Sequence, residues 1–426
     1  MSEEDKFDAI IIGAGTAGCA CAYELAKAGK TVLLVERGTT AGSKNLTGGR
    51  LYTYALEMLE PGLTLRAPLQ RKIVREQITM LGEKNAMTVD YTDYSFGEDV
   101  PQSYSILRAP FDEWFASEAE AQGAMVVSGI LVEGLLEENG RIVGIKAGED
   151  EMYADVVIAA DGVNSLIAQH AGLRREIHPH SVGVGVKEII ELPEDVINSR
   201  FNLEGNEGVA RVTLGCTEGI SGGAFMYTNK NSISLGVIFN PEQAGHHGKR
   251  VHEMMQDFKM NPSVLAMIQG GKTVEYGAHL VPELGYTGVP QRLHKEGLLV
   301  IGDAAGFCIS AGIILRGMDL AILSGIAAAN AVVMSDSTSE IGTNYMNEIN
   351  GLIIPTMKVY ADFHKIMALP RLFVEYPMLA NDLMRGLFSV DGKIPDKMTK
   401  SALKSLKKNV TFGQLISDGW KAVRSA

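Results

Sequence analysis

Four short, mainly apolar runs stand out along the chain, at residues 9–12, 31–35, 156–160 and 297–301. Strands of a parallel sheet have this pattern, because helices cover both of their faces. Small residues at helical spacing follow the first run, and Gly29 marks the end of that helix. We therefore predict a parallel sheet whose strands come from widely separated parts of the chain.

The pattern changes in two inserted stretches, at residues 72–107 and 176–280. Both contain short segments of alternating polar and apolar positions, which are typical of antiparallel strands with one exposed face. From residue 340 the pattern is helical and rich in methionine. The sequence thus predicts an α/β protein with an inserted, mainly antiparallel β domain and a helical C-terminal region.

We divide the chain into three parts on this basis. The parallel-sheet domain is discontinuous and takes residues 1–72, 104–175 and 281–339. The antiparallel-sheet domain takes residues 73–103 and 176–280, and the helical region takes residues 340–426. A chain of 426 residues is long enough for two or three domains of ordinary size.

Composition and charge exclude several classes of protein. The formal net charge is −12, which argues against a nucleic-acid-binding surface. The first residues are acidic where a signal peptide is basic, and the most apolar stretch, residues 311–334, contains Arg316 and Asp319. We therefore expect a cytoplasmic protein. The four cysteines form no Cys-x-x-Cys pair, so we predict no metal site.

The first predicted strand leads into GAGTAG at residues 13–18, and a helix follows. In a dinucleotide-binding fold Gly13 makes the tight turn, Gly15 admits a pyrophosphate, and Gly18 lets helix and strand pack closely. The helix N-terminus offers free N–H groups to the pyrophosphate. Glu36 ends the next strand and is placed to bind a ribose, which favours FAD or NAD over NADP. The predicted cofactor contacts here are Gly13, Gly15, Thr16, Ala17, Gly18, Glu36 and Arg37.

Two further strands end in a carboxylate, in ADVVIAADGVNS (residues 154–165) and GLLVIGDAAGF (residues 297–307). Ligands of open α/β sheets bind beyond the carboxyl ends of the strands, where a carboxylate can bind the hydroxyls of a ribityl chain. The cofactor contacts assigned on this basis are Asp161, Gly162, Gly302 and Asp303.

The three segments in this order resemble the FAD proteins of the aromatic-hydroxylase and geranylgeranyl-reductase group. The resemblance implies a Rossmann-like FAD-binding domain of the GR2 type. The sequence shows no second GxGxxG segment after a strand, so we expect no NAD(P)H domain and an electron supply from another protein.

The apolar helix predicted after Asp303 could affect the charge of the bound cofactor. If residues 312–318 bring its N-terminus under the flavin, the helix dipole stabilises the negative charge of the reduced flavin. Asp319 in the first turn either caps the helix or tunes this charge, and we prefer the capping role. We expect Arg108 to reach the pyrophosphate or the ribityl chain, since arginine commonly binds phosphate.

Beyond GAGTAG, four segments carry a closer resemblance. They are AGSKNLTGGRLY (41–52), VGVKEIIELP (184–193), EYGAHLVPE (275–283) and GDAAGFCISAGIILRGMDLAILSG (302–325). On these residues the chain resembles the electron-transfer-flavoprotein:quinone oxidoreductase family along almost its whole length. The further cofactor contacts assigned in these segments are Asn45, Gly48, Gly49, Arg50, Gly312 and Met318.

The resemblance implies a flavoprotein that carries FAD and takes electrons from an electron-transfer flavoprotein of the FixA/FixB type. It further implies a quinone as acceptor and a ferredoxin-like partner, FixX. The mitochondrial member of the family carries an iron–sulfur domain in the same chain. This sequence lacks the cysteines for one, which fits a separate ferredoxin-like subunit. We assign no catalytic side chain, because electron transfer by a flavin requires no protein acid or base.

Two alternatives stay open. Gly306 stands where aromatic hydroxylases usually have histidine, which lowers the expectation of oxygen activation. Geranylgeranyl reductases share GDAAGF, so reduction of a prenyl double bond is the first alternative. The second is a scaffold subunit that binds FAD only structurally.

The predicted quinone contacts are Tyr227, Tyr276 and His279, which lie near Phe225 and Met226 in the antiparallel domain. An apolar pocket with a few polar groups is expected of a quinone site. A histidine in apolar surroundings is, however, more often a core residue.

Seven cations lie in residues 397–426, against the single acid Asp418. On an acidic protein this segment is either a solvated helix face or a contact for anionic lipid or an acidic partner. We therefore expect peripheral membrane contact as one role of this tail.

Overall fold

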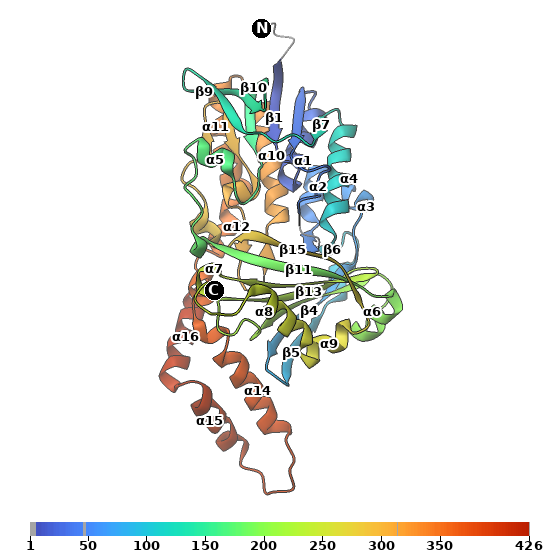
Figure 1. The fold of residues 1–426 in the computed structure, drawn as a ribbon, viewed down its shortest axis with the longest axis vertical. Helices are drawn as coiled ribbons and strands as arrows, with labels where there is room; N and C mark the ends of the chain where they lie inside the picture. Colours follow the sequence, from blue (N-terminus) through green and yellow to red (C-terminus); the bar gives the residue numbers. More distant parts are fainter. Residues whose placement is uncertain (1–5, 46–47, 313, 426) are drawn as a thin grey trace.

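The computed structural model describes residues 6–45, 48–312 and 314–425 and contains two large sheets and a helical C-terminal region (Figure 1). The parallel sheet and its helices lie at one end, and the second sheet crosses the middle. The helices from residue 375 onward project from the other end. The structure confirms the predicted α/β class with an inserted, antiparallel-rich sheet and a helical C-terminal region.

Five parallel strands form the core of the first sheet: Lys6–Ile12 (β1), Val32–Glu36 (β2), Met125–Ser128 (β7), Asp150–Ala159 (β10) and Leu298–Val300 (β17). Their order across the sheet is β7-β2-β1-β10-β17. The antiparallel strands Gly134–Glu138 (β8), Arg141–Ala147 (β9) and His294–Lys295 (β16) extend it. All four predicted buried strands lie in this core, and their carboxyl ends meet at one edge because the strands run parallel.

Helices cover this sheet, and two of them pack closely against each other through small residues. They are Thr16–Lys27 (α1), Tyr54–Leu59 (α2), Leu63–Arg66 (α3), Arg108–Ala121 (α4), Leu166–His170 (α5) and Met318–Met334 (α10). Helices α1 and α10 pack against each other at Gly325, where a Cβ would meet Ala17 O, Cys21 N (2.8 Å) and the Cβ of Ala20 (2.9 Å). The apolar surface of α10 is therefore buried against α1, as expected of a helix that is apolar all round.

The second sheet has nine strands. They are Gly49–Tyr52 (β3), Lys72–Leu81 (β4), Ala86–Thr92 (β5), Ser103–Ile106 (β6), Val182–Glu191 (β11), Glu207–Leu214 (β12), Gly222–Thr228 (β13), Ser232–Phe239 (β14) and Lys272–Pro282 (β15). The order is β15-β11-β14-β13-β12-β4-β6-β3, and β5 pairs with β4. The helices of this part are Glu194–Phe201 (α6), Pro241–Ala244 (α7), Val251–Met260 (α8) and Pro262–Ile268 (α9). Apolar side chains of α8 and α9 pack on one face of the sheet.

Two short strands do not lie where the sequence placed them. We placed β3 in the parallel-sheet domain, but it pairs in the second sheet, and so does β6, which lies across the border that we drew at residues 103 and 104 within an inserted stretch. The reason is non-local pairing, because four residues are too few to show which sheet they join. One pair in the second sheet, β12 with β4, is parallel.

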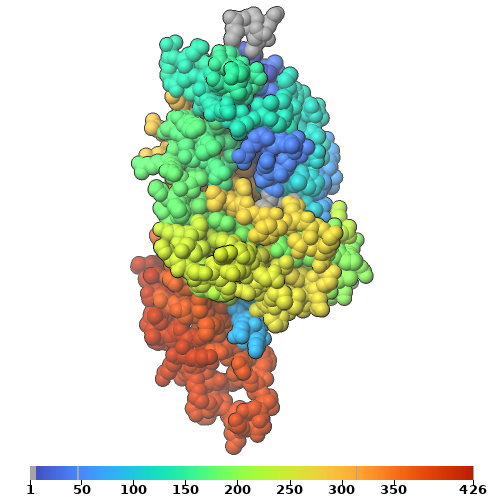
Figure 2. Space-filling view, viewed as in Figure 1, coloured from blue at the N-terminus to red at the C-terminus, as the bar shows by residue number. Residues whose placement is uncertain are grey.

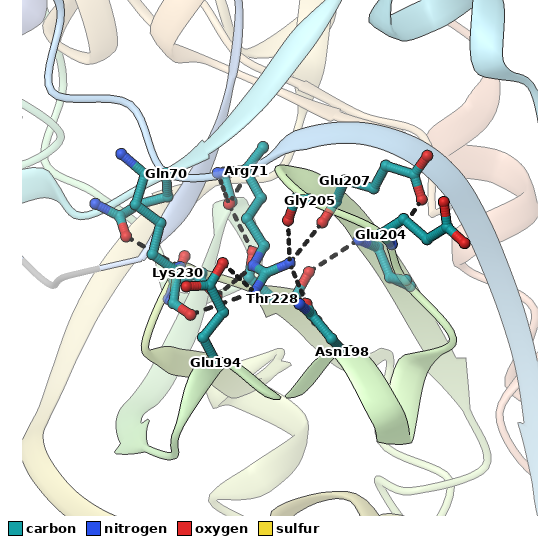
Figure 3. A network of polar contacts seen from close by, with 12 residues as sticks. Gln70, Arg71, Glu194, Asn198, Glu204, Gly205, Glu207, Thr228 and Lys230 are labelled. Atoms are coloured by element: carbon teal, nitrogen blue, oxygen red, sulfur yellow. Dashed lines mark hydrogen bonds and ion pairs between the residues drawn. The ribbon is translucent and has the colours of Figure 1, made fainter. Parts of the chain in front are cut away.

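Arg71 lies between α3 and β4, where its carbonyl accepts from the N–H of Ser105 in β6, and its side chain is fully buried (Figure 3). Its guanidinium donates to Asn229 O (2.7 Å), Asn198 Oδ1 (2.7 Å) and Glu207 O (2.9 Å). Burial lowers the pKa of Arg71, and Glu194 partly offsets that effect. Since most partners are backbone carbonyls, this one side chain joins the ends of α6, β12 and β13.

The C-terminal region comprises Thr338–Leu352 (α11), Ile354–Val359 (α12), Phe363–Met367 (α13), Glu375–Phe388 (α14), Met398–Asn409 (α15) and Phe412–Ser425 (α16). Figure 2 shows its red surface protruding beyond the second sheet. Among the described residues, none of the helices is long and apolar enough to cross a lipid bilayer.

The basic tail is less free than its sequence suggests. Lys400 and Lys404 pair with Asp396, and Lys408 pairs with Asp382 at 2.8 Å. Asp418, the one acid of the segment, is buried and binds Arg371 and Tyr376. Part of the positive charge is therefore neutralised by acids outside the stretch that we counted.

The contact between α1 and α10 gives a test of packing. We expect Gly325→Ala to lower the free energy of unfolding by about 1–3 kcal/mol, because the new Cβ meets backbone atoms that cannot move aside. Gly351 lies in α11 with no atom within 4 Å of a Cβ. Gly351→Ala is therefore the matched control, and it should stabilise the helix by up to about 1 kcal/mol. Denaturant unfolding of the two variants measures both changes, and equal effects would contradict the packing argument.

Candidate functional site

In the glycine turn after β1, two of the three glycines stand where a side chain would clash with the backbone, and the third stands in open space. A Cβ at Gly13, which has φ +105°, would strike the carbonyl of Ala160, and a Cβ at Gly18 would strike the carbonyl of Gly13. A Cβ at Gly15 would meet no atom within 4 Å. The absence of a side chain at Gly15 thus serves no internal packing and leaves space for a ligand.

This open space lies at the N-terminus of α1. Gly15 is the N-cap of the helix, no side chain caps it, and its first turn carries no acidic residue. The first-turn N–H groups, including those of Thr16 and Ala17, thus receive no side-chain cap. Uncapped N–H groups and the positive end of the helix dipole favour an anion such as a pyrophosphate.

Glu36 holds the glycine turn in place. Its Oε2 accepts from the N–H of Ala14 (3.0 Å), and its Oε1 accepts from the N–H of Gly38 (2.6 Å). A carboxylate has about four acceptor positions, so these bonds leave capacity for ribose hydroxyls. Arg37, next along the chain, is exposed, and its charge helps to lower the pKa of His279.

Asp161 follows β10, and its Oδ2 accepts from the N–H of Ile167 at 3.1 Å. Its Oδ1 is buried and has no partner among the described residues. Burial raises the pKa of Asp161. Gly162 has φ +77° and open space around its Cα. The strand end thus offers an unused buried acceptor, as a hydroxyl-bearing ligand requires.

Asp303 lies beyond β17 in a short 3-10 turn, and Gly302 before it has φ +64°. The N–H of Gly302 donates to Ser324 Oγ (2.9 Å) of α10. Burial raises the pKa of Asp303, whereas Arg108 and Arg174 lower it. The carboxylate of Asp303 is thus close to the predicted arginine.

Arg108 and Asn45 meet at the carboxylate of Asp112. The guanidinium of Arg108 donates to both oxygens of Asp112 (3.0 and 2.8 Å), and Asn45 Nδ2 donates to the same group. Asp112 is fully buried. The sequence predicted both residues as ligand contacts but did not show that one carboxylate orients them.

The loop at Gly48 and Gly49 lies between the second sheet and α10. Gly48 has φ +83°, and its carbonyl accepts from Lys187 Nζ of β11 at 3.2 Å. A Cβ at Gly49 would lie 3.8 Å from Met318 Sδ, at the first residue of α10. Gly312 has φ +75° and lies against Met367. The predicted contacts Gly48 and Gly49 thus lie beside Met318 at the start of α10.

Arg50 differs from this group, since its side chain faces the second sheet. It pairs with Glu76, and its Nε donates to Ser103 Oγ at 2.9 Å. Tyr52 lies between two guanidinium groups, that of Arg50 at 4.8 Å and that of Arg316 at 5.5 Å from the ring centroid. The guanidinium of Arg50 is thus held within the protein.

The preferred capping role of Asp319 is wrong. Gly317 is the N-cap of α10, and no side chain caps the helix. Asp319 is buried and instead accepts from Arg316 (2.8 and 2.6 Å) and from the hydroxyl of Tyr54 (3.0 Å). Arg316 precedes the helix in a short strand pair, Ile309–Ser310 (β18) with Leu315–Arg316 (β19), and offers a stronger partner than an N–H group.

The predicted quinone residues do not all share one face of the second sheet. His279 pairs with Gly185 and Tyr276 pairs with Glu188, so their side chains point to opposite faces. Tyr276 is 56% exposed, on the face away from Lys187. Tyr227 lies on the same face as His279 but on β13, beyond β11 and β14. Tyr276 therefore cannot line a pocket with His279. The two residues are three positions apart, and in a strand this spacing already implies opposite faces.

Lys187 is the site residue that the sequence reading missed. It lies over the ring of Phe225 (5.4 Å) and donates to Gly48 O, on the face of the sheet that carries His279. Burial lowers its pKa to about 8, and the charge of Arg108 adds to this effect. The available signal was a lysine inside the apolar strand pattern VGVGVKEII. Figure 2 shows the surface hollowed where the blue N-terminal part faces the yellow part of this sheet.

The open glycine turn, the uncapped helix and the carboxylates at parallel-strand ends define an FAD-dependent oxidoreductase. Residues 8–93 match the family described as FAD dependent oxidoreductase. The solved structure of a geranylgeranyl bacteriochlorophyll reductase-like protein from Thermoplasma acidophilum superposes with a TM-score of 0.72 at 18% identity. The match covers 97% of this chain and 98% of that one, and it concerns the fold alone.

Within this class the chain belongs to the ETF-QO/FixC family of electron-transfer-flavoprotein:quinone oxidoreductases. Residues 182–281 match the ETF-QO ubiquinone-binding family, and residues 362–426 match the ETF-QO/FixC C-terminal domain. Protein FixC of Escherichia coli K12 is 44% identical over 425 residues, 99% of each chain. The probable electron transfer flavoprotein-quinone oxidoreductase YdiS of the same strain is 43% identical over 428 residues, 98% of each chain.

The open position at Gly15 gives a direct test of the phosphate loop. We expect Gly15→Val to fold and to purify without flavin, because its side chain fills the space over the N-terminus of α1 and meets no protein atom at Cβ. Gly134→Val in β8 is the matched control, since a Cβ there also meets nothing within 4 Å. Visible absorbance relative to protein measures the bound flavin. Full flavin content in the Gly15 variant would assign the pyrophosphate to another loop.

Proposed function

We propose that this chain binds FAD non-covalently and passes electrons from a reduced electron-transfer flavoprotein of the FixA/FixB type to a quinone. The observation that carries the proposal is the position of Lys187 and His279. Both lie in the segment that matches the ubiquinone-binding family, on the sheet face that meets the loop at Gly48.

The described residues fit FAD. Gly15, Thr16 and Ala17 would bind the pyrophosphate, because the space over Gly15 is open and the helix is uncapped. Glu36 would bind the adenosine ribose with its remaining acceptor positions. When bound, FAD supplies one-electron and two-electron transfer.

The other end of the cofactor would lie along the strand ends. Asp161 and Asp303 would bind the ribityl hydroxyls, and the orphaned Oδ1 of Asp161 favours that role. The loop at Gly48 and Gly49 and the N-terminus of α10 would orient the ring system. The uncapped helix end favours negative charge nearby, although the pair of Asp319 with Arg316 leaves its first turn close to neutral.

A ferredoxin-like FixX partner is part of the same proposal. Among the described residues no group of three or more His, Cys, Asp or Glu side chains could hold a metal ion. All four cysteines are free, and three of them are buried. An iron–sulfur centre would thus have to come from a partner chain.

We further propose that the C-terminal region contacts the membrane surface, where a quinone pool is found. Phe412, Ile416, Trp420 and Val423 of α16 are 68%, 57%, 59% and 75% exposed and share one face of the helix. The guanidinium of Arg424 lies beside that face, 4.8 Å from the centroid of the Trp420 ring. Such a helix, apolar with Trp and Phe on one side and basic beside it, is typical of an interfacial anchor.

A stopped-flow experiment tests electron transfer. We expect the protein, reduced under anaerobic conditions with a FixA/FixB-type flavoprotein, to be reoxidised rapidly by ubiquinone-1. Neither NADH nor NADPH should reduce it directly. Reduction by NADPH together with turnover of a prenyl substrate would support the prenyl reductase instead. Failure of every acceptor would favour a scaffold role.

Sedimentation with anionic vesicles tests the membrane contact. We expect Ile416→Glu with Trp420→Glu to reduce binding at least about tenfold, since burying one such side chain is worth roughly 1.5–3 kcal/mol. Leu65→Glu, at an 86% exposed position of α3, is the control and should bind as wild type. High salt should weaken binding through the cations. Unchanged sedimentation of the double variant would contradict an anchor at α16.

A further inference from the structure

Three ionisable side chains lie along one face of the second sheet. On β11 the positions Gly183, Gly185 and Lys187 share this face because side chains alternate along a strand. His279 of β15 pairs with Gly185 and lies on the same side. Successive positions on one face are about 7 Å apart, so His279 lies between Gly183 and Lys187 along the sheet.

Glu283 completes the row at the end of β15. Its Oε1 occupies the place where a Cβ of Gly183 would lie, so its carboxyl group packs on the same face. Burial raises the pKa of Glu283 to about 7, and a hydrogen bond with Asn240 opposes this rise. The carboxyl group thus changes its protonation near neutral pH.

A small cavity lies beside Glu283, near the surface of the protein. Its polar lining comes from Glu283, Tyr286, Ser310, Tyr360 and His364. Tyr286, Tyr360 and His364 are partly exposed. One end of the row therefore borders a cavity whose lining is partly exposed to solvent.

Lys187 forms the other end of the row, where its Nζ lies 3.2 Å from Gly48 O and over the ring of Phe225. His279 lies between the two ends, and Val281 lies beside it on the same face, towards Glu283. Burial lowers its pKa to about 4, and the charges of Lys187, Arg108 and Arg37 add to this effect. The imidazole is therefore neutral and can accept a proton at one nitrogen while it donates from the other.

None of the three groups has an ion-pair partner among the described residues. On the opposite face of β11 the buried Glu188 is paired with Lys259 at 2.6 Å and accepts from Thr273 at 2.9 Å. Burying a charge without a partner is costly, so a purely structural acid or base is usually paired as Glu188 is. An unpaired row beside a ligand site instead favours groups that gain and lose protons.

We propose that Glu283, His279 and Lys187 form a proton relay from the cavity at His364 to the quinone. This relay rests on the proposed function. Over a full turnover, two electrons from the reduced electron-transfer flavoprotein and two protons from water are added to the two carbonyl oxygens of a quinone, which gives a quinol. Glu283 accepts a proton from the cavity, His279 passes it along the sheet, and Lys187 donates it at the site.

Quinone and ferricenium separate proton delivery from electron transfer. We expect Glu283→Gln, reduced with dithionite, to be reoxidised by ubiquinone-1 at least about tenfold more slowly than wild type, the usual scale of a lost proton donor. Ferricenium takes one electron and no proton, so its reduction should be unchanged. Glu191→Gln, at the exposed end of β11, is the control. Glu283→Asp should restore part of the rate.

The pH profile gives a second criterion. A donor must be protonated, so the wild-type rate with ubiquinone-1 should fall as pH rises through about 7, and Glu283→Gln should lose this step. The charged or titratable groups near the row are Arg37, Arg108, Cys308 and His364. Infrared titration of the flavin-free protein should show a carboxylic acid band with the same midpoint, which is missing in Glu283→Gln.

The outcomes separate the relay from the function on which it rests. If wild type reduces ubiquinone-1 and Glu283→Gln matches its rate and pH profile, the relay is wrong and the proposed function stands. If wild type reduces ferricenium but no quinone, both fail. Equal slowing of ubiquinone-1 and ferricenium in Glu283→Gln would also overturn the relay, because the defect would then lie in electron transfer.

Discussion

Close approach of backbone segments around α1 is the constraint on which the site depends. A Cβ at Gly13 would strike the carbonyl of Ala160, and a Cβ at Gly18 would strike the carbonyl of Gly13. A Cβ at Gly325 of α10 would strike the backbone of α1. The backbones of β1, β10, α1 and α10 therefore lie close together, with no side chain between them, and a close-packed interior of this kind leaves them little room to shift. The open space over Gly15 is defined by them, and so is the distance from the helix N-terminus to the strand ends.

Positive side chains lie around that space although the chain as a whole is acidic. The chain carries a formal charge of −12, yet Arg37, Arg108 and Lys187 all lie close enough to His279 to lower its pKa. Arg108 is held by the buried carboxylate of Asp112. An anionic cofactor therefore meets positive charge from the parallel-sheet part and from the second sheet together, and its binding would couple the two parts.

The parts of the site that depend on local pattern could be predicted from the sequence. A strand, a glycine turn and a helix are contiguous, so the roles of Gly13 and Gly18 followed from spacing. Pairing across the sheet is non-local, which is why β3 was placed in the other sheet. Lys187 was overlooked because nothing next to it in sequence reveals the loop at Gly48. The opposite directions of Tyr276 and His279, by contrast, follow from strand alternation and were available from the sequence.

The two models that are specific to this family match outside the parallel sheet, one in the second sheet at residues 182–281 and one in the C-terminal region at residues 362–426. A geranylgeranyl bacteriochlorophyll reductase-like protein shares the fold over 97% of this chain at 18% identity, so the fold identifies the class and no more. One face of β11 is packed by α8 and holds the ion pair of Glu188 with Lys259. The other face carries Gly183, Gly185 and Lys187, and His279 of β15 lies beside Gly185. One face of β11 thus packs against α8 and holds a paired carboxylate, whereas the other face holds ionisable side chains that have no ion-pair partner among the described residues.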